Sequence, residues 1–274
     1  MNYKMPTREQ NSNKGSFGKV LNFCGSENYI GAAYLSTISS LKVGAGFSAL
    51  STTQHVIDSV SCILPEAVYL TQKQGLEKIN DFSVVLIGCG LGISEESKKL
   101  LENVLKNIKT DIPLIIDADG LNLLALAESL QNSSSLKTKG SVIMTPHPLE
   151  ASRLLDCDLK DVLNNIEDAA KKITAKYNCV TVLKTHRSIV CDTNFEIHIN
   201  QHGNSALAKA GSGDVLAGII AGLLAQGMSH YEACKLGVYL HSRTGEIASE
   251  ELTEYSVLAS DLSKYIHKAI KEIL

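Results

Sequence analysis

Residues 210–214 read Ala-Gly-Ser-Gly-Asp and lead directly into an apolar segment that ends at Ala225. The apolar residues predict a helix buried on most sides, and the glycines allow bare backbone N–H groups to meet an anion at its N-terminus. Such a turn would hold transferring phosphate oxygens, while Asp214 could accept a proton from an attacking hydroxyl. The two parts together indicate phosphoryl transfer. The alternative is that Asp214 only caps the helix.

Two further segments carry acids at the ends of expected strands. Residues 117–122 read Asp-Ala-Asp-Gly-Leu-Asn, and these two carboxylates could meet a magnesium ion or a ligand hydroxyl. Capping of the next helix by Asp119 is the alternative. In Thr-Pro-His-Pro-Leu-Glu (145–150), Glu150 could hold a hydrated metal next to phosphates, whereas His147 taken alone is more typical of a structural residue.

Several common site motifs are missing from the sequence. The glycine cluster Gly88-Cys89-Gly90-Leu91-Gly92 can form a ligand loop, but Ile93 stands where a dinucleotide fingerprint needs glycine. There is no Walker A loop, no G-x-S-x-G elbow, no H-E-x-x-H pair and no Cys/His set with zinc spacing. The common hydrolase and metalloprotease interpretations are therefore excluded.

The elements that must position these residues follow an alternating pattern, which is typical of a mostly parallel sheet covered by helices on both faces. Strands are predicted at Gly18–Cys24, Phe82–Gly88, Pro113–Asp117, Ser141–Thr145 and Cys179–Lys184, and an antiparallel edge hairpin at Arg187–Cys191 and Phe195–Asn200. Helices are predicted at Ile30–Val43, Glu95–Lys106, Leu121–Leu130, Leu149–Leu155, Asp161–Tyr177, Asp214–Ala225, Tyr231–Glu250 and Ser256–Ile273. Carboxyl ends of such strands are where parallel sheets bind ligands.

Composition sets the protein class. The chain has 274 residues, is 44% hydrophobic and 20% charged, and carries a formal net charge of -3, which excludes a polybasic nucleic-acid binder. Seven scattered cysteines without a Cys-x-x-Cys pair indicate a reducing, cytoplasmic setting, and we expect neither a secretion signal nor a membrane span. With no repeat or linker, residues 1–274 are predicted to form one domain, with residues 132–135 in a surface loop.

Six blocks in order resemble the NAD(P)H-hydrate dehydratase family, whose domain is ribokinase-like. They are GSENYIGAAYLSTISSLKVGAG (25–46), VVLIGCGLG (84–92), DADGLN (117–122), TPHPLE (145–150), VLK (182–184) and GNSALAKAGSGDVLAGIIAGLLAQG (203–227). The resemblance spans nearly the whole chain. It implies a three-layer α/β/α ribokinase-like domain without the lid of sugar kinases, assembled as a homotetramer.

The resemblance also implies a repair reaction. The (S) form of hydrated NADH or NADPH would be phosphorylated on its C6 hydroxyl by ADP or ATP with Mg²⁺ and would then lose phosphate to regenerate the normal cofactor. ADP is the donor that we expect to be preferred. A functional link to an NAD(P)H-hydrate epimerase is implied as well.

Carried over position by position, the resemblance assigns site residues. Asp214 would be the catalytic base and Glu150 the acid on the magnesium side. The substrate would contact Ala32, Ala33, Gly90, His147 and Asp214. The nucleotide would contact Lys184, Thr185, His186, Arg187, Ser188, Asn204, Gly211, Ser212 and Gly213.

The chain departs from the family pattern at two positions. Cys89 stands where the family usually has proline, and Thr185 where it has glycine after the lysine. A β-branched residue resists positive φ, so if the family's turn needs that conformation, the loop 184–188 must take another path here.

Two other functions fit the same motifs. One is a ribokinase-like kinase that stops after phosphorylating a hydroxymethyl group of a vitamin precursor; the other is a nucleotide-binding protein without activity. A dehydratase must accept a whole dinucleotide, so we expect Gly90 and His147 to line one long groove. Asp214 behind a Gly-Ser-Gly turn argues against a protein that only binds.

Overall fold

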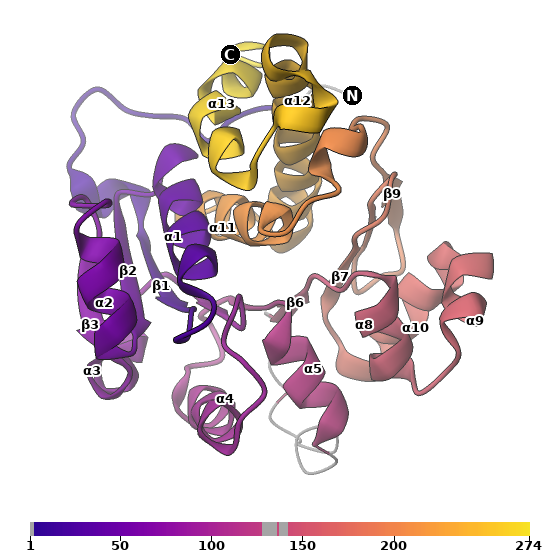
Figure 1. The fold of residues 1–274 in the computed structure, drawn as a ribbon, viewed down its shortest axis with the longest axis horizontal. Helices are drawn as coiled ribbons and strands as arrows, with labels where there is room; N and C mark the ends of the chain where they lie inside the picture. Colours follow the sequence, from indigo (N-terminus) through magenta and orange to yellow (C-terminus); the bar gives the residue numbers. More distant parts are fainter. Residues whose placement is uncertain (1–2, 128–135, 137–141) are drawn as a thin grey trace.

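The computed structural model describes residues 3–127, 136 and 142–274, and their strands form a single mixed sheet (Figure 1). The strand order is β3-β2-β1-β4-β5-β6-β7-β8-β9. Every pairing from β3 across to β7 is parallel, and β8 and β9 add antiparallel strands at one edge. The strands are β1 (Lys19–Phe23), β2 (Phe47–Thr52), β3 (Val68–Thr71), β4 (Val84–Ile87), β5 (Leu114–Ile116), β6 (Val142–Met144), β7 (Val180–Leu183), β8 (Ile189–Cys191) and β9 (Ile197–Ile199).

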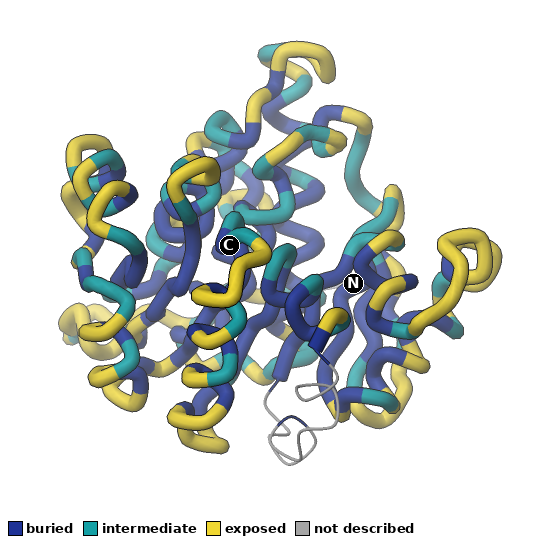
Figure 2. The backbone as a smooth tube through the Cα atoms, turned by 60° about the horizontal axis from the view of Figure 1, so that its bottom comes forward, coloured by how far each residue is buried: buried dark blue, intermediate teal, exposed yellow. Residues whose placement is uncertain are grey.

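Helices cover both faces of the sheet, so the predicted three-layer α/β/α class is confirmed. One face packs against α1 (Ile30–Lys42), α2 (Gln54–Ser61), α11 (Ser212–Ala225), α12 (His230–Ser256) and α13 (Ala259–Lys271). The other packs against α3 (Gln72–Glu77), α4 (Glu95–Asn107), α5 (Asp119–Leu126), α8 (Pro148–Leu155), α9 (Leu159–Asn164) and α10 (Ile166–Tyr177). Figure 2 shows the consequence: buried residues gather along the central strands, and exposed residues gather on the outer sides of the helices.

Among the described residues, the sequence patterns missed two strands, β2 and β3, and two α-helices, α2 and α3. Serines interrupt the apolar run of β2, which hides its strand character. In the structure the hydroxyl of Ser48 hydrogen bonds the hydroxyl of Ser40 and the side-chain amide of Asn22, both at 2.9 Å. A polar residue can lie in a central strand when such partners satisfy it.

The helix predicted over Asp161–Tyr177 is wrong in one respect, because the structure has two helices there, α9 and α10. Asn165 separates them with non-helical backbone angles, φ -146° and ψ 78°. Its side-chain oxygen accepts a hydrogen bond from the N–H of Asp168 and so caps α10. Helix Leu121–Leu130 is confirmed as far as Leu126, while its last three residues and the loop predicted at 132–135 lie outside the described residues.

The buried helix α11 owes its position to glycines. A Cβ on Gly218 would lie 2.2 Å from the backbone oxygen of Ser36, and one on Gly222 would lie 2.5 Å from that of Ser40. Because both oxygens belong to α1, the two helices approach closely enough for only glycine to fit between them. This contact fixes the N-terminus of α11 relative to α1 and the sheet.

We predict that Gly218→Ala lowers the free energy of unfolding by ~2 kcal/mol, because the new methyl group forces two backbones apart. Urea denaturation of the variant and the wild type measures this difference in the free energy of unfolding. The matched control is Gly31→Ala in α1, where a Cβ meets nothing within 4 Å; we expect no loss there. Equal stability of the Gly218 variant and the wild type would contradict this packing.

Candidate active site

The N-terminus of α11 is open. The helix begins at Ser212 after Gly211, whose φ of 90° suits glycine, and no side chain caps it. Asp214 is the third helical residue and partly exposed. The alternative role of Asp214 as a cap is therefore wrong. The N–H of Ser212 donates to the backbone oxygen of Lys209 at 3.2 Å, whereas the N–H groups of Gly213 and Asp214 have no partner among the described residues and are available to an anion.

A buried ion pair lies beside this turn. Lys184 follows β7, and its Nζ lies 2.6 Å from Oδ1 of Asp117, which follows β5. The same oxygen accepts a hydrogen bond from the hydroxyl of Thr145 at 2.6 Å. The ammonium also lies 4.0 Å from Glu150 and close to Gly213, whose Cβ would be 3.3 Å from Nζ. Lys184 thus places a positive charge at the anion-binding turn.

Asp119 does not have the helix-capping role that the sequence left open for it. It does not cap α5, whose N-cap is Ala118 without a side-chain bond; instead its Oδ2 accepts the N–H of Gly92 at 2.8 Å. Ala118, between the two acids, has φ 48° and ψ -117°, a strained conformation for a residue with a Cβ. The strain is the cost of turning Asp117 toward Lys184 and Asp119 toward the glycine loop.

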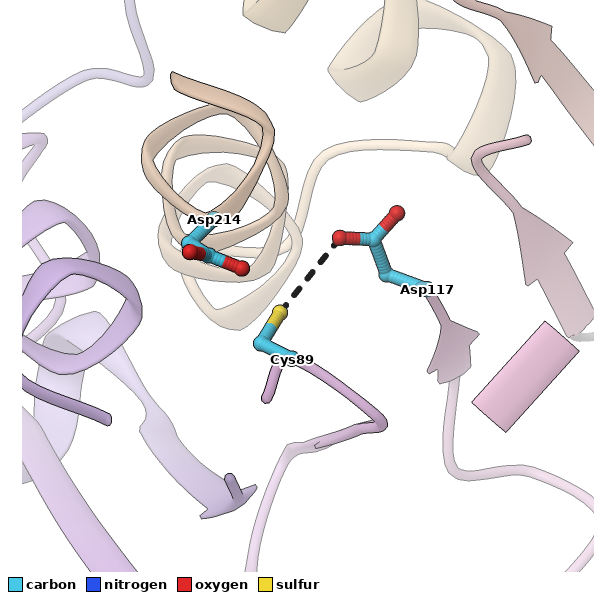
Figure 3. A group of neighbouring side chains, drawn as sticks. All are labelled: Cys89, Asp117 and Asp214. Carbon is cyan, nitrogen blue, oxygen red and sulfur yellow. Dashed lines mark hydrogen bonds between the residues drawn. The ribbon is translucent and has the colours of Figure 1, made fainter. Parts of the chain in front are cut away.

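Cys89, Asp117 and Asp214 form a compact group (Figure 3): the sulfur and one oxygen of each carboxylate lie within 4.8 Å of one another. Metals can bind such a group, but here Lys184 already neutralises Asp117. The neighbouring Cys24 thiol, burial and the two carboxylates raise the pKa of Cys89 well above its usual value, so the thiol keeps its proton. The group therefore suits the sharing of protons better than the binding of a metal.

Burial raises the pKa of Asp214 to about 7, and the charge of Asp117 adds to the rise, whereas Lys184 and Cys89 oppose it. Burial likewise raises the pKa of Glu150 to about 7. A carboxylate with a pKa near neutrality is a stronger base than an ordinary one and suits proton abstraction at physiological pH.

His147 and Glu150 begin α8 as a reciprocal cap. Nδ1 of His147 accepts the N–H groups of Leu149 and Glu150, and Oε2 of Glu150 accepts the N–H of His147 at 2.8 Å. Because Nδ1 is an acceptor, the neutral ring carries its proton on Nε2, 3.3 Å from Oε1 of Glu150. His147 therefore has the structural role that its sequence context suggested, although its ring also borders the cavity.

A cavity of about 600 Å³ opens in front of Lys184 and the first turn of α11. Of the predicted residues, it is lined by His147, Lys184, Thr185, His186, Ser188, Asn204, Ser212 and Gly213. Arg187, Gly211, Asp214, Glu150, Gly90, Ala32 and Ala33 do not line it. Of the two residues expected to line one groove, His147 borders this cavity and Gly90 does not, so the shared groove stays a prediction.

Gly90 packs against the start of α1 instead. With φ 60°, a Cβ there would lie 2.6 Å from that of Ala32 and 2.7 Å from that of Tyr29. Ala32 is partly exposed, whereas Ala33 is fully buried in the core. The contacts of these residues with substrate stay predictions, and for Ala33 the burial favours a packing role.

The loop 184–188 accommodates Thr185 without positive φ. The hydroxyl of Thr185 donates to the backbone oxygen of Arg187 at 2.8 Å, and that of Ser188 donates to the oxygen of Thr185 at 3.3 Å. These two bonds close the turn in a conformation that a β-branched residue tolerates.

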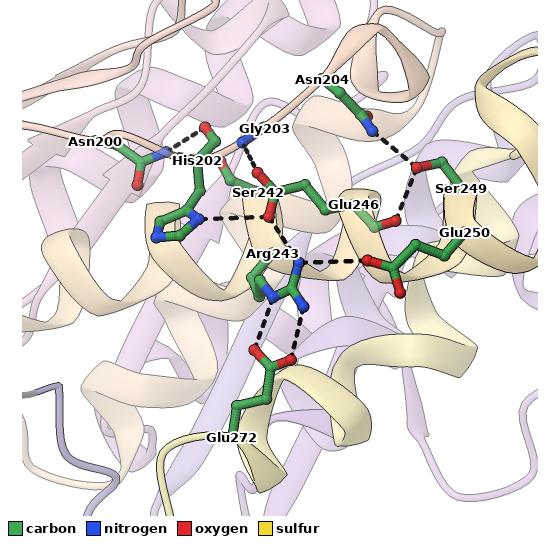
Figure 4. Close-up of polar contacts among 10 residues, drawn as sticks. All are labelled: Asn200, His202, Gly203, Asn204, Ser242, Arg243, Glu246, Ser249, Glu250 and Glu272. Carbon is green, nitrogen blue, oxygen red and sulfur yellow. Dashed lines mark hydrogen bonds and ion pairs between the residues drawn. The ribbon is translucent and has the colours of Figure 1, made fainter.

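The opposite wall of the cavity is tied to α12 (Figure 4). The N–H of Gly203 donates to Oε1 of Glu246 at 2.6 Å, and the side-chain amide of Asn204 donates to the hydroxyl of Ser249 at 2.8 Å. Arg243 in turn pairs with Glu246 and, through two bonds, with Glu272 of the C-terminal segment. The loop that carries Asn204 is therefore held by a charged network and not by packing alone.

Sequence reasoning missed His241, which lines the cavity from α12. Its Nε2 lies 3.0 Å from the hydroxyl of Ser212, and burial lowers its pKa to about 4, so the ring is neutral. The available signal was an isolated histidine within an apolar stretch of a helix. Ser242, which also lines the cavity, was missed as well. The remaining lining residues belong to the block 203–227 that carries the resemblance, although none of them was assigned a contact: Gly203, Ser205, Leu207, Ala208, Lys209, Ala210 and Leu216.

With this geometry established, comparison with known proteins identifies the family. A family model for NAD(P)H-hydrate dehydratase matches residues 20–268. The chain belongs to this family. A bifunctional NAD(P)H-hydrate repair enzyme from Thermofilum pendens is 33% identical over 98% of the chain, but the match covers 53% of that protein. The chain spans about half the length of such bifunctional relatives.

Solved structures confirm the fold. A ribokinase-like superfamily protein from Enterococcus faecalis superposes with a TM-score of 0.89 at 30% identity, covering 98% of this chain and 92% of that one. The ADP/ATP-dependent NAD(P)H-hydrate dehydratase from Bacillus subtilis, crystallised with ATP and Mg²⁺, gives 0.87 at 30% identity over the full length of both. No helix within the described segments has both the length and the apolar character needed to cross a bilayer.

The ion pair between Lys184 and Asp117 yields a stability prediction. Lys184→Met leaves a buried carboxylate without its partner, so we expect a loss of ~3 kcal/mol in the free energy of unfolding. The double variant with Asp117→Asn should recover more than half of that loss. Denaturant titration of the four proteins gives the coupling; additive effects would mean that the two charges do not interact.

Proposed function

We propose that this chain dehydrates the (S) form of hydrated NADH or NADPH, using ADP or ATP to phosphorylate the C6 hydroxyl before phosphate is eliminated. The proposal rests on one observation. A carboxylate with a pKa raised to about 7, Asp214, stands on the uncapped first turn of α11, beside Lys184 and the mouth of a cavity large enough for a nucleotide. Family membership supplies the substrate class.

In the proposed reaction, Asp214 accepts the proton of the C6 hydroxyl while that oxygen attacks the terminal phosphorus of the nucleotide. The N–H group of Gly213 and the ammonium of Lys184 stabilise the negative charge on the phosphoryl oxygens. The O–P bond to the leaving nucleotide breaks. The lone pair of the ring nitrogen then expels phosphate from C6, and loss of a ring proton restores the reduced nicotinamide.

Glu150 is the residue that we assign to magnesium. The donor set fits, since a carboxylate oxygen is a hard ligand. Oε1 of Glu150 lies 3.3 Å from Nε2 of His147, whereas Oε2 accepts the backbone N–H of His147. When bound, the ion would neutralise charge on the nucleotide phosphates. The protein's own contribution is to keep Glu150 next to Lys184 and His147, two residues that line the cavity.

We also propose ADP as the preferred donor, a homotetramer as the working form and a reducing cytoplasm as the setting. The Bacillus subtilis relative is an ADP/ATP-dependent enzyme, which supports a nucleotide donor. All seven cysteines are free thiols, which supports a reducing setting. The existence of bifunctional repair enzymes among the relatives supports a functional link to an epimerase. Light scattering tests the tetramer, and matched rates with ATP would remove the preference for ADP.

The reaction is tested by supplying hydrated NADH and NADPH with Mg²⁺ and either nucleotide, and by following the return of the near-ultraviolet absorbance of reduced nicotinamide. Asp214→Asn should lower kcat by about 10²–10⁴-fold, because the base is lost, while nucleotide affinity measured by calorimetry stays close to the wild-type value. Near-normal turnover of this variant would reject Asp214 as the base. Phosphorylated product that accumulates without elimination would indicate a kinase.

The raised pKa of Asp214 sets the pH dependence. Protonation removes the base, so kcat/KM should fall about tenfold per pH unit below a midpoint near pH 7, and it should level off above that midpoint. An ordinary carboxylate would keep its activity down to about pH 4. A profile that is flat from pH 5 to 8 would show that burial does not control this group.

A further inference from the structure

Cys89 is a buried thiol at the centre of the carboxylate group. Its side chain is 0% exposed, and its Sγ lies 3.4 Å from Oδ2 of Asp117. An oxygen of Asp214 lies within 4.8 Å of this sulfur and of one carboxylate oxygen of Asp117. In Figure 3 the sulfur points up from the loop after β4 into the space between the two acids.

The hydrogen bonds of the two carboxylates are unequal. Asp117 accepts from Lys184 and from Thr145 in addition to Cys89. For Asp214, the described part of the chain offers no side-chain donor other than the Cys89 thiol, which is among the groups that lower its pKa. A carboxylate that is ionised in a largely buried position needs a donor to hold it in one orientation.

We infer that Cys89 is a positioning residue for the proposed base: its thiol proton, directed to Asp117 in this structure, turns to Asp214 when that carboxylate is ionised and holds it toward the acceptor hydroxyl. Rotation about one bond suffices, since the sulfur stays in place. This inference rests on the proposed function only for its catalytic readout, because the hydrogen bond can be measured without turnover.

The surroundings support a donating thiol. Cys24, at the end of β1, is a fully buried neighbour, and the N–H of Gly25 donates to the backbone oxygen of Cys89 at 2.8 Å, so the loop is fixed. The thiol keeps its proton, as its raised pKa indicates. Asp117, Asp119 and Lys184 are the other charged groups that act on Asp214, and all three are unchanged by a substitution at Cys89.

Three variants test the role. Cys89→Ala removes the donor, so the midpoint of the kcat/KM profile should move upward by roughly half to one pH unit, the shift expected for a lost hydrogen bond. At pH 6.5 the rate should fall several-fold while KM for the nucleotide holds. Cys89→Ser restores a donor and should return the midpoint to the wild-type value or below.

The matched control is Cys234→Ala, which deletes another fully buried thiol of the same core layer, away from the carboxylates. It should lose comparable stability and keep the wild-type pH profile. An unshifted midpoint in Cys89→Ala, or the same shift in Cys234→Ala, would overturn the inference.

A second measurement does not depend on activity. The infrared S–H stretching band of Cys89, isolated as the difference between wild type and Cys89→Ser, should move to lower frequency as pH rises through 7. The thiol then turns from Asp117, whose charge is shared with Lys184 and Thr145, to the ionised carboxylate of Asp214, which is the stronger acceptor. In Asp214→Ala that pH-dependent shift should vanish. A band that is insensitive to both changes would overturn the inference even if the enzyme is active. If the wild-type protein does not dehydrate hydrated NADH or NADPH but the band shift is present, the proposed function is overturned and the inference about Cys89 is not.

Discussion

The ion pair between Lys184 and Asp117 is the interaction on which the site depends. Two acids, Asp117 and Glu150, lie 1% and 4% exposed within 4.0 Å of this ammonium, and a third, Asp214, is close by. Burial alone would lower the pKa of Lys184, but Asp117 and Glu150 outweigh it and raise the pKa. Because one cation serves several acids, it cannot keep all of them fully ionised. The acids that it neutralises less, Asp214 and Glu150, are left with pKa values near 7, which is the property a general base requires.

Parallel topology brings these groups together. Cys89 and Asp117 are 28 residues apart, and Asp117 and Lys184 are 67 apart, yet each follows a strand of the same sheet and so reaches the same edge. A glycine then allows the loop that carries Cys89 to approach the end of β5 closely. A Cβ on Gly88 would lie 2.0 Å from the backbone oxygen of Asp117, so the loop that carries Cys89 can touch the end of β5 only without that side chain.

The sequence predicted those parts of the site that depend on residues close together in the chain. The buried helix behind Asp214, the strand ending at Asp117 and the loop at Lys184 each have a pattern in a short window of residues. The pairing of Lys184 with Asp117 leaves no such pattern in the sequence, because it depends on the order of the strands in the sheet. His241 was missed for the same reason: its partner, Ser212, lies on another helix. Strand β2 was missed because Ser48 is buried by means of distant partners, Asn22 and Ser40.

The residues in the first turn of α11 face two different surroundings. Ser212 and Gly213 line the cavity proposed for the nucleotide, whereas Asp214, one residue later, does not line it and faces Cys89 and Asp117. In-line displacement requires the attacking oxygen and the leaving oxygen on opposite sides of phosphorus. In the proposed reaction, the terminus of α11 would meet this requirement with adjacent residues, the N–H of Gly213 for the phosphoryl group and the carboxylate of Asp214 for the acceptor. Because the close packing of Gly218 and Gly222 on α1 fixes that terminus, the spacing of donor and acceptor is set by the core of the protein and not by a mobile loop.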